Sequence, residues 1–105
     1  MKVNIQLKRR DGKAEAKGVF EDGKVTVKKG SVIKLETTSK FKGFSAALEK
    51  RNDTSVVDKN GLVKKDVTFN SPSTAGVFVL GSSVNGWATW KTSEGKKLSE
   101  VVKEK

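Results

Sequence analysis

The chain has 105 residues, of which 34% are hydrophobic, and its 22 Lys and Arg against 12 Asp and Glu give a formal net charge of +10. The longest uninterrupted apolar run, Val77 to Leu80, is far shorter than the roughly 20 residues of a membrane-spanning helix. Cysteine and histidine are absent, which excludes disulfides, thiolate or imidazole zinc sites, and Ser–His or Cys–His catalysis. A chain of this length is expected to form one domain over residues 1–105. No secretory signal is visible at the start of the chain, so we expect a cytoplasmic location.

The positive charge is concentrated in the first half of the chain. Residues 1–52 hold 14 basic and 6 acidic side chains, whereas residues 53–105 hold 8 and 6. An excess of this size is typical of proteins that bind a polyanion, with nucleic acid first and an acidic membrane surface as a weaker option. The alternative is that the lysines only keep a small domain in solution.

The first 36 residues predict an antiparallel meander. Apolar residues alternate with polar ones at Val3, Ile5 and Leu7, which is the period of a strand. Asp-Gly pairs between such alternating runs are strong hairpin signals. The predicted strands begin within residues 1–13 and then cover 14–20, 24–28 and 31–36, with turns at Asp11-Gly12, Asp22-Gly23 and Lys29-Gly30.

After residue 40 the hydrophobic period changes and predicts short helices. A three-to-four residue spacing favours a helix over 41–52, and alternation favours a strand over 62–69. Ser71 and Pro72 are typical of a helix N-terminus and Gly81 of a C-terminal cap. An Asn85-Gly86 turn, an extended run over 87–92, a turn over 93–96 and a terminal helix from Leu98 follow. The expected fold class is α+β, an antiparallel sheet (the N-terminal meander plus later strands) packed with two or three short helices.

No set of side chains predicts catalysis. Asp53, Asp58 and Asp66 form a loose carboxylate group whose spacing fits no metal site, and turn residues explain them better. Lys28-Lys29-Gly30-Ser31 and Gly81-Ser82-Ser83 superficially resemble phosphate loops, but neither lies in the strand–loop–helix context that such loops need. We therefore expect no enzyme, no metal and no cofactor.

Three groups of residues are candidates for nucleic-acid contacts. The helix N-terminus at Ser71 could hold a phosphate, or it could be an ordinary capped helix. Trp87 could stack on a base while Asn85 reads a base edge, or the tryptophans could pack in the core. The lysines could follow the phosphates or form a solvated face. The complete candidate set is Lys24, Lys28, Lys34, Lys64, Lys65, Ser71, Ser73, Thr74, Asn85, Trp87 and Lys91.

Four segments of the second half resemble a known bacterial family. They are Phe69-Asn70-Ser71-Pro72-Ser73-Thr74-Ala75, Val79-Leu80-Gly81, Asn85-Gly86-Trp87-Ala88-Thr89-Trp90-Lys91 and Glu94-Gly95-Lys96-Lys97-Leu98. The chain is similar over about 14–101 to domain-of-unknown-function family 4357, whose members often follow GIY-YIG endonucleases and other restriction-associated proteins, and it also resembles the RAMA domain. The chain departs from the family pattern at Gly76, where Ala is usual, and at Ser82, where relatives often carry Arg.

The family has no established activity. The resemblance implies nucleic-acid binding only because of the proteins that the family's members accompany. Charge and resemblance together predict a non-catalytic nucleic-acid-binding module, with DNA as the expected ligand and a nuclease or methylase subunit as an expected protein partner. No membrane partner is expected. The alternative is a protein-interaction or structural module in which the shared motif is only the fold's core. The hypothesis requires the meander lysines and the start of the 71–80 helix to share one surface.

Overall fold

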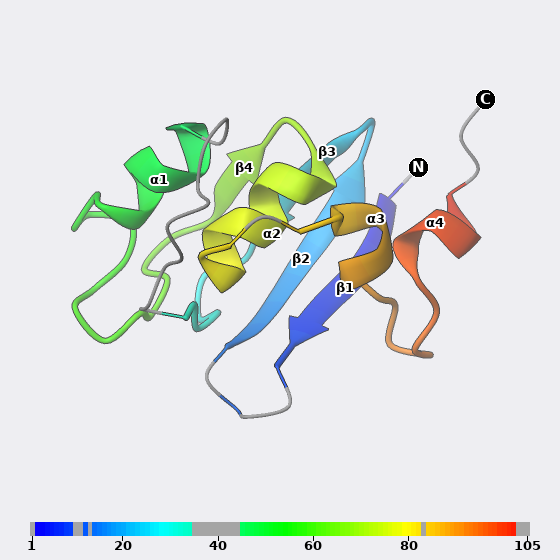
Figure 1. The fold of residues 1–105 in the computed structure, drawn as a ribbon, viewed down its shortest axis with the longest axis horizontal. Helices are drawn as coiled ribbons and strands as arrows, with labels where there is room; N and C mark the ends of the chain where they lie inside the picture. The colour runs from blue at the N-terminus through cyan, green and yellow to red at the C-terminus, as the bar shows by residue number, and fades with distance from the viewer. Residues whose placement is uncertain (1, 10–11, 13, 35–44, 83, 103–105) are drawn as a thin grey trace.

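The computed structural model describes residues 2–9, 12, 14–34, 45–82 and 84–102. Within them the fold is α+β, as predicted: a four-stranded antiparallel sheet and four short helices (Figure 1). The strands are β1 (Lys2–Lys8), β2 (Glu15–Glu21), β3 (Lys24–Val27) and β4 (Val67–Phe69), and the helices are α1 (Ser45–Arg51), α2 (Pro72–Leu80), α3 (Gly86–Thr89) and α4 (Leu98–Val101).

The predicted meander is confirmed for its first three strands, and local turn chemistry explains the hairpin between the second and the third. The sheet order is β1-β2-β3-β4, so the first three strands pair in sequence. Asp22 and Gly23 join β2 to β3 with positive φ angles of 53° and 82°. Positive φ at both central residues matches the right-handed twist of a two-residue hairpin, and Asp-Gly tolerates it best. Lys91 pairs with Gln6 beyond the other edge of β1, and Lys97 pairs with Lys91.

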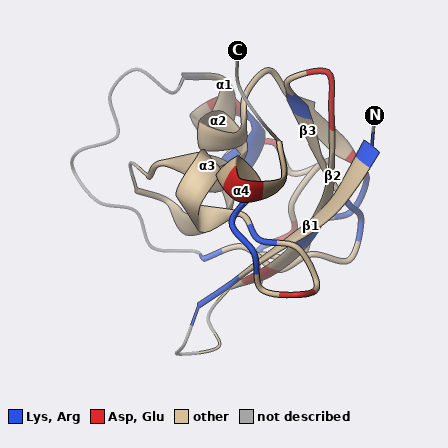
Figure 2. Cartoon of the chain, turned by 90° about the vertical axis from the view of Figure 1, so that its right-hand side faces the viewer, with Lys and Arg blue, Asp and Glu red and all other residues tan. Residues whose placement is uncertain are grey.

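The helices gather on one side of the sheet and leave its other face open (Figure 2). Alternate strand residues point toward the helices and form the core, including Ile5, Phe20 and Val25. Trp90 and Phe78 are the two largest side chains that are completely buried. No helix in the described part of the chain is long and apolar enough to cross a membrane. We call the side of the sheet that faces away from the helices the outer face.

Helix α2 begins and ends as its sequence predicts. The Ser71 hydroxyl accepts a hydrogen bond from the Thr74 N–H, and Pro72 occupies the first turn. Gly81 adopts the left-handed conformation at φ 71°, and its N–H donates to the carbonyl of Val77. The buried surface of α2 is wider than the predicted apolar stripe, because the residues from Ala75 to Leu80 are buried. The helix lies between the sheet and its neighbours α1 and α3.

Three predicted elements differ from the structure because tertiary contacts override the local pattern. In the strand predicted over 31–36, residues 31–34 make only single bridges and hydrogen bonds to several different segments, and residues 35 and 36 lie outside the described part. The 62–69 prediction holds only for β4 at its end, since Leu62 and Val63 pair elsewhere. The 87–92 run begins as helix α3, capped by Asn85. The predicted helix over 41–52 is confirmed from Ser45 to Arg51, and its first residues lie outside the described part.

Arg51 ties α1 to the rest of the helical layer. Its guanidinium donates hydrogen bonds to the carbonyl of Phe78, near the C-terminal end of α2, and to the carbonyl of Lys34. A cation near a helix C-terminus is favoured by the partial negative charge of the last carbonyls. Burial lowers the pKa of Arg51 from its usual value, but guanidinium remains charged at any physiological pH.

Candidate nucleic-acid interface

The strand register divides the outer face into rows of side chains. Residues directly opposite each other in an antiparallel pair point to the same face of the sheet. Gln6 lies opposite Lys17 in the β1–β2 pair and opposite Lys91 at the outer edge of β1. Lys28 directly follows β3, and its N–H donates to the carbonyl of Lys17 at 2.8 Å. Lys28 therefore lies in the same row as Gln6 and Lys17. One row therefore crosses the whole outer face.

This row contains four lysines. Lys91 lies opposite Lys97, at the far end from Lys28, and the segments that carry them run side by side (Figure 2). All four lysines are exposed. We call this set the lysine row; in spatial order it consists of Lys97, Lys91, Gln6, Lys17 and Lys28.

The neighbouring rows are less positive than the lysine row. Toward one end of the strands, Val19 lies opposite Asn4 and Thr26, and Thr26 bonds to Thr68 through their hydroxyls at 2.9 Å. In the last row at that end, Glu21 lies between Lys2 and Lys24. Toward the other end, Lys8 and Glu15 approach to 4.0 Å. Most of the excess positive charge of the outer face therefore belongs to the lysine row.

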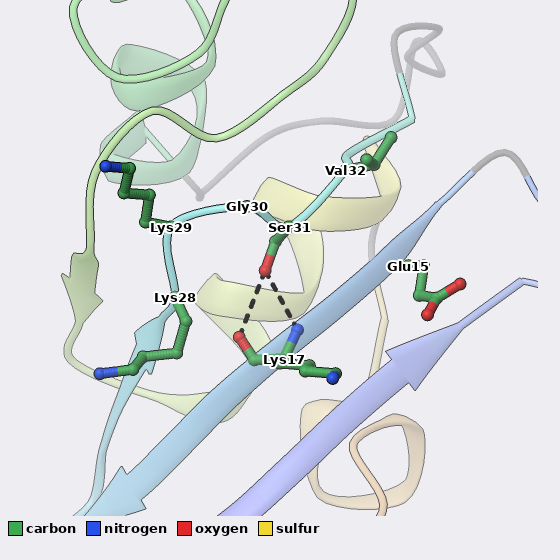
Figure 3. Close-up of a pocket in the computed structure, with 7 residues that line it drawn as sticks. All are labelled: Glu15, Lys17, Lys28, Lys29, Gly30, Ser31 and Val32. Carbon is green, nitrogen blue, oxygen red and sulfur yellow. Dashed lines mark hydrogen bonds between the residues drawn. The ribbon is translucent and has the colours of Figure 1, made fainter.

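The lysine row places like charges side by side. Neighbouring strands lie about 4.8 Å apart, and like charges directly opposite each other destabilise a sheet. Lys17 and Lys28 extend their side chains away from each other (Figure 3). Lys28 reaches Asp66, whose carboxylate lies 3.2 Å from its ammonium group. Both side chains are about half exposed, so this is a weak surface ion pair that only partly offsets the charge of Lys28. At the other end, Glu100 accepts a hydrogen bond from the backbone N–H of Lys97.

Two hollows flank Lys17 and Lys28. One has a volume of about 610 Å³ and is also lined by Lys29, Ser31 and Glu15 (Figure 3). The other has a volume of about 340 Å³ and is lined by polar residues of β1 and by Ser93. Both are open depressions on the outer face. They leave the two ammonium groups accessible to a ligand that lies on the sheet.

The loop from Lys28 to Ser31 is not a phosphate cradle. Such a cradle needs free backbone N–H groups, but the N–H of Lys29 donates to Asp66 at 2.8 Å and that of Gly30 to the carbonyl of Val63 at 2.9 Å. The Ser31 N–H bonds within the turn, and its hydroxyl accepts from the N–H of Lys17 at 3.1 Å. An anion at this place would therefore meet lysine side chains rather than backbone donors.

Two carboxylates of the loose acidic group serve their own turns, as the sequence predicts, whereas Asp66 bonds to the distant Lys28–Lys29 segment. Asp53 accepts from the N–H and hydroxyl of Ser55, and Asp58 from two N–H groups of its own turn. Hydrogen bonding to the charged form lowers the pKa of both. The pKa of Asp66 is also lowered, first by the Lys29 N–H and then by the Lys28 ammonium. Among the described residues, no group of three or more acidic side chains could hold a metal ion.

We expect Asp66 to titrate below the usual Asp pKa of about 3.9, and Lys28→Gln to raise that pKa without restoring it fully, because the Lys29 N–H bond remains. Carboxyl-carbon NMR titration measures this, with Asp58 as an internal control that should not change. Because these folded-state pKa values are lowered, the carboxylates stabilise the fold above about pH 4, and this contribution is lost as the pH falls through the lowered values. An unchanged Asp66 pKa in the variant would contradict the ion pair.

The predicted single surface is wrong, because the sheet separates its two parts. Lys24 and Lys28 alternate with the buried Val25 and Val27, so they lie on the outer face. Helix α2 packs against the opposite face. Of the predicted lysines, Lys24, Lys28 and Lys91 share the outer face. The other three lie elsewhere: Lys64 donates to the carbonyl of Thr54, Lys65 lies near Asp53, and the backbone of Lys34 bonds to Val79.

The helix N-terminus is used inside the fold, as the ordinary-cap alternative proposed. Ser71 and Thr74 bond to each other through their hydroxyls at 2.9 Å. The Ser73 hydroxyl accepts from the N–H of Gly86 at 3.0 Å, and Pro72 is completely buried. Helix α3 therefore packs closely against the start of α2, and these side chains already have protein partners.

The tryptophan region also belongs to the helical layer. Trp90 is completely buried, and its indole N–H donates to the carbonyl of Pro72 at 3.0 Å. Trp87 is half-buried and packs edge-on against Phe20, with ring centroids 5.4 Å apart. The side-chain oxygen of Asn85 accepts from the Trp87 N–H and caps α3. Base contacts by Asn85 and Trp87 remain a prediction, and their place is remote from the outer face.

The sequence analysis missed Lys17 and Lys97. Lys17 carried a usable signal, because strand alternation with the apolar Ala16 and Phe20 places it on the polar face. Lys97 carried none, since its position depends on a single bridge to Lys91 in a predicted turn region. Only the three-dimensional pairing joins them to Lys28.

Comparison with known proteins places the chain in a family but not in a functional class. No curated protein and no solved structure shows a significant match. A family model described as a domain of unknown function (DUF4357) matches residues 5–102, which includes most of β1 and therefore begins earlier than the similarity expected from residue 14. Because the match covers nearly the whole chain, the protein belongs to the DUF4357 family.

Proposed function

We propose that this domain binds nucleic acid, with DNA as its ligand, through the lysine row on the outer face of the sheet. The observation that carries the proposal is the charge of this row. It holds four exposed lysines across adjacent strands, with Asp66 at one end, while in the two charged rows on either side of it Glu15 or Glu21 offsets a lysine. A cationic stripe of this kind is the electrostatic footprint of a polyanion site.

The resemblance to domains that accompany restriction-associated proteins adds a role to this proposal. A non-catalytic domain with a charged sheet face would hold DNA for an active centre located elsewhere. The corresponding partner is a nuclease or methylase subunit. In this arrangement the helical layer supplies stability, and the outer face supplies the affinity for DNA.

The alternative is a protein-interaction module. The observation that favours it is the exposure of two large apolar side chains, Leu48 and Leu62, each 42% accessible. Leu62 lies opposite Val32 at an isolated bridge, and Val32 also lines the larger hollow. A protein partner could use this apolar edge. In that case the lysine row would contribute only to solubility.

The proposal predicts that replacing the four lysines of the row by glutamine removes most of the affinity for DNA. Each lost phosphate contact changes the slope of log affinity against log salt by about 0.9 on duplex DNA, so the slope should flatten by about 3.6. The measurement is a fluorescence-anisotropy titration at several salt concentrations. A matched variant replaces four lysines outside the row, Lys50, Lys59, Lys64 and Lys65, with the same change in net charge.

The matched variant should keep most of the affinity and of the salt slope, because its lysines lie outside the outer face. Thermal unfolding of both variants checks that the fold is intact. Equal losses in the two variants would mean that net charge, and not the row, drives binding. Unchanged DNA binding in the row variant, or no DNA binding by the unmodified domain at low salt, would favour the protein-interaction alternative.

A further inference from the structure

We infer that the ligand is duplex DNA that crosses the strands of the sheet and is held through its phosphates, independently of sequence. This inference rests on the proposed function and specifies its substrate class and orientation. Three features of the structure support it: the direction of the lysine row, the chemistry of the groups in that row, and the width and composition of the outer face.

The direction follows from where charge accumulates. Along β2, the outer-face side chains are Glu15, Lys17, Val19 and Glu21, so a polyanion parallel to this strand would meet a carboxylate at each end. Along β1 or β3 it would meet only two lysines, Lys2 and Lys8 or Lys24 and Lys28. Across the strands, the same polyanion meets the lysine row. Four strand steps of about 4.8 Å make this row about 19 Å long. That is close to the length of six base pairs at about 3.4 Å each.

The preference for a duplex follows from the absence of a stacking surface. Single-strand binders combine positive charge with aromatic side chains on which bases stack. Among the described residues, the outer face carries no aromatic ring: Phe20, Phe69 and Phe78 are buried, and Trp87 packs in the helical layer. A site built only from ammonium groups binds most tightly to the nucleic acid with the highest charge density. A duplex releases more counterions per contact than a single strand does.

Sequence independence follows from the shape of the face and the type of donor. Five adjacent strand segments are about 19 Å wide, whereas the major groove is about 12 Å wide and admits a helix or a two-stranded ribbon. The sheet face would therefore rest on the phosphates instead of entering the groove. Lysine is a flexible point charge without the planar, bidentate geometry of arginine, so it suits phosphate better than base edges.

The first test compares ligands for the unmodified domain. Three 16-base-pair duplexes of different base composition are titrated, together with the single strands of each. We expect the duplexes to bind within about twofold of one another and at least tenfold more tightly than the single strands at 50 mM salt, with salt slopes near −0.9 per contact. Equal or tighter binding of the single strands would overturn the inference, as would a duplex preference for one sequence above tenfold.

The second test addresses orientation with single substitutions. Lys17→Gln, Lys28→Gln, Lys91→Gln and Lys97→Gln should each flatten the salt slope on duplex DNA by about 0.9. The matched controls are Lys2→Gln, Lys8→Gln and Lys24→Gln, which lie on the same face in rows that also contain Glu15 or Glu21 and should leave the slope unchanged. Slope losses at Lys2, Lys8 and Lys24 equal to those in the row would overturn the crossing orientation.

The proposed function and this inference can be contradicted by different results. If the four-lysine variant loses both duplex and single-strand binding, but the unmodified domain prefers single strands, the proposed function stands and the inference is wrong. If the four-lysine variant binds every ligand as the unmodified domain does, the proposed function itself is wrong.

Discussion

Replacing Gly86 by alanine is expected to destabilise the domain by about 3 kcal/mol or more, the upper range for overpacking a closely packed site. A Cβ atom on Gly86 would lie 2.1 Å from the carbonyl carbon of Pro72, 2.2 Å from its oxygen and 2.3 Å from the N of Ser73. All three are backbone atoms, so no side-chain rotation can relieve the contact. Helices α2 and α3 would have to separate, which would also break the Gly86–Ser73 hydrogen bond.

Urea denaturation monitored by circular dichroism measures this loss, and Gly95→Ala is its control. Gly95 has a positive φ of 83° and no heavy atom within 4 Å of a built Cβ, so alanine there meets only backbone strain of about 1–2 kcal/mol. If Gly86→Ala were no more destabilising than Gly95→Ala, the close approach of the two helices would be incorrect.

Replacing Trp90 by alanine is expected to cost about 3–5 kcal/mol, the usual range for a completely buried aromatic residue. Trp90 joins the sheet to the helices: a Cβ on Gly18 of β2 would lie 3.5 Å from its ring, and a Cβ on Gly76 of α2 would lie 3.7 Å from its indole nitrogen. The two glycines thus leave room for the ring. Gly76 costs helix propensity, about 1 kcal/mol relative to alanine, but a Cβ there would also approach Val84 to 2.7 Å.

The variant Trp90→Phe separates packing from hydrogen bonding. It keeps an aromatic ring in the core and leaves the buried carbonyl of Pro72 without the indole donor, which costs about 1–3 kcal/mol. Urea denaturation therefore should rank the two variants, with alanine the less stable. Trp87→Phe serves as the comparison at the half-buried position and should cost less than Trp90→Ala. A Trp90→Ala loss below about 1 kcal/mol would contradict a core position for this ring.

The helical layer and the outer face can therefore be varied independently. Gly86 and Trp90 stabilise contacts on the inner side of the sheet, whereas the lysine row lies on exposed side chains of the other side. We expect lysine variants to change DNA affinity with little change in stability, since surface substitutions usually alter stability by no more than about 0.5 kcal/mol. Core variants should change stability first.

Local signals were sufficient wherever a segment's neighbours in the sequence are also its neighbours in space. The Asp22-Gly23 hairpin, the Ser71 and Pro72 helix start and the Gly81 cap all depend on backbone conformations that these residue types favour. The turn roles of Asp53 and Asp58 were predicted for the same reason, whereas the contacts of Asp66 with Lys28 and Lys29 are long-range. By contrast, residues 87–92 were predicted to be extended, and contacts with α2 and Phe20 stabilise a helical turn at the start of this run instead.

The amino-acid sequence by itself determined the α+β class, the meander and the excess of positive charge. Only the tertiary structure decided where that charge gathers. Lys17 and Lys28 lie on neighbouring strands because a hairpin aligns them. Lys91 joins them by pairing with Gln6 of β1, more than eighty residues earlier in the chain, and Lys97 joins them by pairing with Lys91. Strand alternation then turns these lysines to the outer face and the Ser71 helix start to the inner side. Side-chain direction depends on register, and long-range register is fixed by packing of the whole core.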